Sequence, residues 1–155
     1  MLECQRMARE AQLQLLSSYE TIELAEAALN EVCEAAEIHG ELRYWAGMAL
    51  REALANAIKH GNKLNPDKRV HVEIVAEPHV MLRMIVDDEG EGFDPASLGD
   101  PREPENVLRT SGRGIFYIRH FVDEVRFATA PGGGTRIELV KNLNSTQKAS
   151  LRRES

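Results

Sequence analysis

Residues 51–62 read Arg-Glu-Ala-Leu-Ala-Asn-Ala-Ile-Lys-His-Gly-Asn, and no other stretch of the chain says more about its fold. Four polar side chains recur at helical spacing and would share one face of a helix: Glu52, Asn56, Lys59 and His60. The amide oxygen of Asn56 is a suitable ligand for Mg²⁺, which prefers oxygen donors. Glu52, one turn earlier, can accept a proton from a hydroxyl group. A solvated helix surface would show the same pattern, so this stretch alone leaves both interpretations open.

Three glycine-containing motifs follow along the chain: Asp88-x-Gly90-x-Gly92, Gly112-Arg113-Gly114 and Gly134-Thr135. In the first, a carboxylate at a strand end can accept a hydrogen bond from the amino group of adenine, and glycines let the backbone approach the base and ribose. The second opens a predicted helix, where backbone N–H groups and the helix dipole favour phosphate. The third places a hydroxyl at the exit of a tight turn. Each motif is also typical of an ordinary turn or loop, so only their combination is informative.

Around these motifs the pattern predicts one domain with helices and strands. Apolar periodicity predicts helices over 19–37 and 42–60, with Ser17 and Ser18 as caps of the first and Gly61 as a left-handed cap of the second. Strands are expected over 13–16, 70–74, 80–86, 125–129 and 135–140, and a short helix over 115–121. For residues 13–16 a helix stays open as an alternative. The loop over 95–109 is expected to be a lid. The fold class predicted is α+β: a two-layer α/β sandwich with a mixed, mostly antiparallel sheet and helices on one face.

Composition narrows the function classes. The 155 residues carry a net charge of −6, and the tail from residue 141 onward carries +3, so residues 1–140 carry −9. This balance argues against a nucleic-acid partner, which normally meets a clustered basic face. The sequence shows no apolar run of the ~20 residues that a membrane helix needs and no signal-peptide pattern, so we expect a cytoplasmic protein without a membrane partner. Residues 1–12 are expected to be a frayed extension, 13–141 the domain, and 142–155 a disordered tail.

Together, the order and spacing of the motifs over residues 42–141 resemble the GHKL ATPase superfamily. The closest resemblance is to its anti-sigma-factor serine/threonine kinases. Residues 52–61, Glu-Ala-Leu-Ala-Asn-Ala-Ile-Lys-His-Gly, are similar to their Glu-Ala-x-x-Asn-Ala-x-x-His-Gly helix, and residues 111–115 and 121–125 are similar to their lid-to-helix segment. Arg113 departs from the pattern, because many relatives have an uncharged residue there.

The resemblance implies a Bergerat-type fold that binds ATP with Mg²⁺ and a protein that is commonly a homodimer. It also implies two protein partners: a sigma factor, and a STAS-type anti-sigma-factor antagonist that is phosphorylated on serine. Carried over by motif, Glu52 is the general base, Asn56 holds Mg²⁺ and Asp88 reads adenine. The remaining ATP-binding residues implied are the following: Lys59, His60, Gly90, Gly92, Gly112, Arg113, Gly114 and Thr135.

A second function stays open beside the kinase, namely a nucleotide-gated module that sequesters a sigma factor or another partner with little or no phosphotransfer. Glu52 favours the kinase, because a simple clamp has no need of a base beside the Mg²⁺ ligand. His39 lies next to Gly40 at a predicted helix end, so it is expected to be a capping residue rather than a phosphoacceptor.

Overall fold

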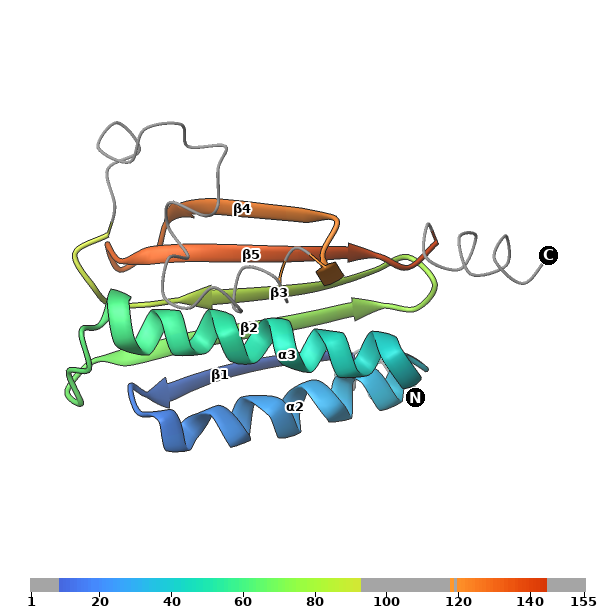
Figure 1. The fold of residues 1–155 in the computed structure, drawn as a ribbon, viewed down its shortest axis with the longest axis horizontal. Coiled ribbons are helices and arrows are strands. Elements are labelled where there is room, and N and C mark those ends of the chain that lie inside the picture. Colours follow the sequence, from blue (N-terminus) through green and yellow to red (C-terminus); the bar gives the residue numbers. More distant parts are fainter. Residues whose placement is uncertain (1–8, 93–117, 119, 145–155) are drawn as a thin grey trace.

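The computed structural model describes residues 9–92, 118 and 120–144. Within them, one five-stranded sheet has two long helices on one face (Figure 1). The strands are β1 (Glu10–Leu16), β2 (Arg69–Glu77), β3 (Met81–Asp87), β4 (Glu124–Thr129) and β5 (Thr135–Asn142). The helices are the 3-10 turn η1 (Tyr19–Thr21), α2 (Ile22–Ala35), α3 (Gly40–Asn56) and the π-helical turn η2 (Ala57–Gly61).

The sheet has the strand order β1-β2-β3-β5-β4, and each of these four pairings is antiparallel. The predicted α+β two-layer sandwich is therefore confirmed, and the sheet expected to be mixed is antiparallel in every pairing that the structure describes. The step from β3 to β5 leaves β4 at the edge of the sheet, opposite β1 (Figure 1). Both β3 and β5 consequently lie inside the sheet, and the end of β3 carries the Asp88 motif.

The core lies between the sheet and the two helices. β2 alternates along its length, and its buried residues belong to that core: Val70, Val72, Ile74 and Ala76. The predicted apolar face of α2 is confirmed, since these residues are all buried: Ile22, Ala25, Leu29, Val32 and Ala36. Burying each large apolar side chain contributes about 1.5–3 kcal/mol. This core, to which α3 also contributes buried residues, therefore holds both helices against the sheet.

Several predicted boundaries differ from the structure. β1 begins at Glu10, three residues before the expected start, because it pairs with β2 along its whole length. The first helix ends at Ala35, and Glu37 takes a left-handed φ of 58°. His39 precedes α3 and makes no capping bond, so its predicted role as a C-terminal cap is wrong. Gly40 begins α3 instead of ending α2, with a φ of 63° that suits glycine.

The end of the second predicted helix holds a further correction. Gly61 is not left-handed; the positive φ values in this region belong to Lys63 and Leu64, at 53° and 60°. The chain makes a π-helical turn from Ala57 to Gly61, which no sequence pattern signalled. Such turns occur frequently at functional sites. The glycine at 61 therefore needs another explanation, which the site provides.

The two predicted capping serines have different roles. The Ser18 side chain accepts a hydrogen bond from the backbone N–H of Glu20 at 3.4 Å and caps η1. Ser17 is instead buried, and its hydroxyl accepts a hydrogen bond from Asn62. Of the predicted helix over 115–121, the structure describes Ile118, His120 and Phe121, which are helical, and the ring of His120 lies 4.4 Å from that of Trp45 on α3.

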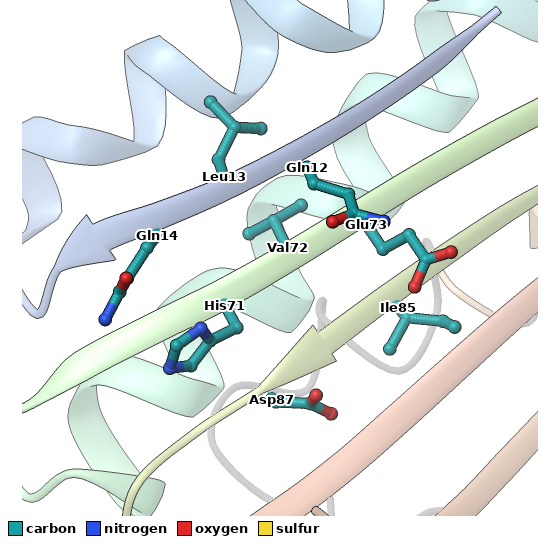
Figure 2. A pocket seen from close by; sticks show the side chains of 8 residues that line it. All are labelled: Gln12, Leu13, Gln14, His71, Val72, Glu73, Ile85 and Asp87. Carbon is teal, nitrogen blue, oxygen red and sulfur yellow. The ribbon is translucent and has the colours of Figure 1, made fainter. Parts of the chain in front are cut away.

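The sheet face opposite the helices is polar and crossed by ion pairs. Arg136 of β5 donates two hydrogen bonds of 2.8 Å to the carboxylate of Asp87 on β3. Next to Asp87, a hollow of about 350 Å³ lies over β1, β2 and β3 (Figure 2). Its polar lining comes from Gln12, Gln14, His71, Glu73 and Asp87. None of the predicted site residues lines this hollow, so it is separate from the motifs.

Candidate nucleotide-binding site

Asp88 is the central residue of the candidate site. It follows β3 directly, and 7% of its surface is exposed. One carboxylate oxygen, Oδ1, accepts hydrogen bonds from the backbone N–H groups of Gly90 at 2.9 Å and Thr135 at 3.0 Å. The backbone N–H of Asp88 donates in turn to the carbonyl of Thr135 at 3.0 Å. These bonds fix the plane of the carboxylate and leave Oδ2 as the oxygen available to a ligand.

Glycines enclose this carboxylate where any side chain would collide with it. A Cβ on Gly61 would overlap Oδ2 and Cγ of Asp88 and lie 2.9 Å from its Cβ. A Cβ on Gly134 would overlap the Asp88 carbonyl and lie 2.6 Å from Oδ1, and one on Gly90 would overlap the carbonyl of Gly61. Carbon atoms normally approach no closer than about 3.5 Å. The three glycines therefore let three separate segments meet at one acidic group.

The electrostatics of Asp88 follow from this enclosure. Burial raises the pKa of its carboxyl group above the ordinary value, and the N–H groups of Thr135 and Gly90 act against that rise. The neighbouring charge of Asp87 raises the pKa further, and Lys68 lowers it. A buried carboxylate that keeps one free oxygen is a strong acceptor for an N–H donor of a ligand.

Asn56 and Glu52 both lie in the last two turns of α3, the helix that leads into the turn ending at Gly61. Asn56 is the last residue of α3 and only 8% exposed, and Glu52 is half-buried one turn earlier. Burial raises the pKa of Glu52 above its ordinary value, while Arg51 lowers it. Both side chains present oxygen atoms from the same part of the helix. In the described part of the chain, no three His, Cys, Asp or Glu side chains gather as a metal site.

Lys59 and His60 lie in the π-helical turn, and both are exposed. Burial of the imidazole, followed by the charge of Lys59, lowers the pKa of His60 below its ordinary value. The 3.6-residue spacing that predicted one shared face does not apply across a π-helical turn, which has more residues per turn. The prediction of a shared face therefore stands for Glu52 and Asn56, which both lie on α3. Helical spacing does not place Lys59 and His60 on that face.

Gly92 reaches the same region from the other side. Its φ is 78°, and a Cβ there would lie 2.8 Å from the carbonyl of Gly133 in the β4–β5 turn. Gly112, Arg113 and Gly114 lie outside the described residues, as does the predicted lid over 95–109. The structure thus brings together the first and third motifs and Gly61, at the end of the π-helical turn.

Some residues of the site were missed or misassigned from the sequence. Gly61 was assigned as a helix cap, although its contact with Asp88 explains it. Asn62 and Arg136 were not singled out at all. The sequence signal for Asn62 was only its place directly after the helix motif. The signal for Arg136 was only its place directly after the Gly134-Thr135 motif.

The chain is similar to known proteins in sequence and in fold. Residues 15–141 match the family described as histidine kinase-like ATPase domain, so the chain belongs to that family. It is 34% identical over 100 residues to the anti-sigma F factors of Bacillus velezensis and of Bacillus subtilis. Each alignment covers 62% of this chain and 66% of the relative, which is slightly less than two thirds of the relative's length.

Two solved structures share the fold. The RsbU and RsbW domains of Rv1364c from Mycobacterium tuberculosis match with a TM-score of 0.52 at 19% identity, over 85% of this chain and 32% of that chain. The histidine kinase domain of the blue-light activated histidine kinase from Erythrobacter litoralis matches with a TM-score of 0.53 at 21% identity, over 80% of this chain and 63% of that chain. These likenesses support the same architecture. Among the described helices, none is both long and apolar enough to cross a membrane.

Proposed function

We propose that this domain binds ATP with Mg²⁺ and transfers the γ-phosphoryl group to a serine of an anti-sigma-factor antagonist, while also binding a sigma factor. The geometry of Asp88 carries the proposal. Its Oδ1 is held by two backbone N–H groups, and Oδ2 lies against Gly61 without space for a side chain. An ionised oxygen in this position would accept a hydrogen bond from the amino group of adenine and repel the carbonyl oxygen of guanine.

The residues at the end of α3 fit a magnesium ion that is held mainly by the nucleotide. Mg²⁺ usually keeps several waters and binds through one or two protein oxygens and the substrate phosphates. Asn56 offers a neutral amide oxygen, and Glu52 a carboxylate one turn away. When bound, the ion would neutralise charge on the phosphates. The small number of protein ligands is in keeping with this mode of binding.

Glu52 would act as the base of the transfer. Its carboxylate accepts the proton of the serine hydroxyl as the serine oxygen bonds to the γ-phosphorus, and the bond from that phosphorus to the β–γ bridging oxygen breaks to release ADP. A positioned base contributes roughly 10²–10⁴-fold in rate. The raised pKa of Glu52 brings its proton affinity closer to that needed at neutral pH. Gly112, Arg113 and Gly114 would supply phosphate contacts, and Thr135 would support the adenine end.

The partners are inferred from the relatives. The similar Bacillus proteins are named anti-sigma F factors, which supports a sigma factor as one partner. The antagonist as second partner is proposed from the motif resemblance. A cytoplasmic homodimer is part of the same proposal.

The cognate antagonist is first identified by affinity capture with ATP present. The test is then single-turnover transfer of the γ-phosphoryl group from labelled ATP to that antagonist. Label on an antagonist serine is the expected result. Capture of a sigma factor without any phosphotransfer would instead favour the second candidate, a nucleotide-gated binding module. The presence of Glu52 argues against this second candidate, because a binding module needs no base.

A further inference from the structure

Asn62 lies directly after the π-helical turn, and its side chain is fully buried. Its amide group makes hydrogen bonds to three separate segments. Nδ2 donates to the hydroxyl of Ser17 at 3.0 Å and to the carbonyl of Arg69 at 2.9 Å. Oδ1 accepts from the backbone N–H of Glu89 at 2.8 Å. Both donors and the acceptor of this amide are thus used within the protein.

Glu89 follows Asp88 directly, so the hydrogen bond from the Glu89 N–H to Asn62 holds the backbone on one side of the Asp88 carboxylate. The bend is held on the other side by the two bonds between Asp87 and Arg136. In addition, Oε1 of Glu89 accepts a hydrogen bond from the backbone N–H of Arg69. Arg69 therefore contacts Asn62 through its carbonyl and Glu89 through its N–H, which closes a ring of three residues.

The two anchors of Glu89 differ in their exposure to water. The Glu89 side chain is 39% exposed, so water competes for its carboxylate. The side chain of Asn62 is buried, and the bond that it accepts from the Glu89 N–H is partly shielded from water, whereas the bond to the Glu89 carboxylate is exposed. The better shielded bond is the stronger constraint on position. The amide of Asn62 is accordingly the main constraint on the backbone at Glu89.

We propose that Asn62 is a positioning residue, which fixes the Asp87–Glu89 bend so that Oδ2 of Asp88 is aimed at the adenine amino group before nucleotide arrives. The inference rests on the proposed function, because it assumes that Asp88 reads adenine. Asn62 does not touch the nucleotide in this proposal; it acts through Glu89. Asn62 should therefore affect the preference of the site for adenine, in addition to any effect on folding.

The matched variants are Asn62→Leu, which removes the Glu89 anchor, and Ser17→Ala, which removes a different partner of the same amide. The readout is the ratio of the dissociation constants of purine riboside triphosphate, which lacks the amino group, and ATP, measured by calorimetry. In the wild type this ratio should be about tenfold or more, since a hydrogen bond to a charged group is lost. Asn62→Leu should lose most of the ratio, and Ser17→Ala should keep it. A general loss of stability would weaken both nucleotides alike and leave the ratio unchanged.

A retained ratio in folded Asn62→Leu, or an equal loss in both variants, would overturn the inference. If Asn62→Leu does not fold, hydrogen exchange of the nucleotide-free wild type decides: the Glu89 amide should be as protected as the Asp88 amide, and free exchange at Glu89 would refute pre-positioning. Failure of the proposed function looks different, because the wild type would then bind no ATP or show no preference for it. The exchange measurement still tests the anchor in that case.

Discussion

Gly61→Ala is the most direct test of the glycine enclosure around Asp88. The added Cβ would lie within 3 Å of Oδ2, Cγ and Cβ of Asp88, so rotation of the carboxylate cannot relieve the overlap. The carboxylate must then move away from the N–H groups of Gly90 and Thr135. Losing one hydrogen bond to a charged group costs roughly 1.5–3 kcal/mol. For a chain of this size, we expect the melting temperature to fall by about 3 to 12 °C.

The same displacement moves Oδ2, so ATP affinity should fall by about tenfold or more. Thermal unfolding followed by circular dichroism and calorimetric titration with ATP measure the two effects. Gly47→Ala is the control: Gly47 lies within α3, and a Cβ there meets nothing within 4 Å. Alanine is favoured in a helix by about 1 kcal/mol, so this variant should be slightly more stable. Wild-type stability and affinity in Gly61→Ala would refute the enclosure.

Three further predictions concern the proposed chemistry. Glu52→Gln should abolish most phosphotransfer and remove the acidic limb of its pH–rate profile, which in the wild type should lie above the ordinary pKa of glutamate. The pKa of Glu52 is raised in the folded state, so its ionised form destabilises the fold above that pKa. Glu52→Gln should therefore unfold at a higher temperature than the wild type at pH 7. This difference in melting temperature should vanish as the pH falls through the raised pKa. Asn56→Ala should make ATP affinity nearly equal with Mg²⁺ and with chelator; an unchanged dependence on Mg²⁺ would remove Asn56 as ligand. Asp88→Asn should weaken ATP by about tenfold or more, and equal competition by ATP and GTP in the wild type would contradict base reading by Asp88.

The sequence predicted those features that depend on local pattern. The buried face of α2 and the alternation of β2 are confirmed, because periodicity reports directly which residues face a core. The Asp88 bend was also found at a strand end, although its role in binding adenine stays a proposal. These features need only neighbours in sequence, and the helical or extended period carries the information.

Other features depend on contacts between distant segments, which a single sequence does not encode visibly. Gly61 was interpreted by its φ preference, but the structure uses it for close approach to Asp88. Both uses require glycine, so the residue type cannot distinguish them. Asn62 and Ser17 are 45 residues apart and meet only when β1 pairs with β2. The π-helical turn changed the expected placement of Lys59 and His60, since the 3.6-residue period was assumed to continue.

The contact between Trp45 and His120 provides an internal optical reporter. Trp45 is the only tryptophan of the chain, so no other indole contributes to its fluorescence. The centre of its ring lies 4.4 Å from that of the His120 ring. His120 follows the glycine motif at 112–114 by only a few residues. Emission intensity therefore records any change in the distance between the two rings, and a nucleotide titration can be followed without attaching a dye.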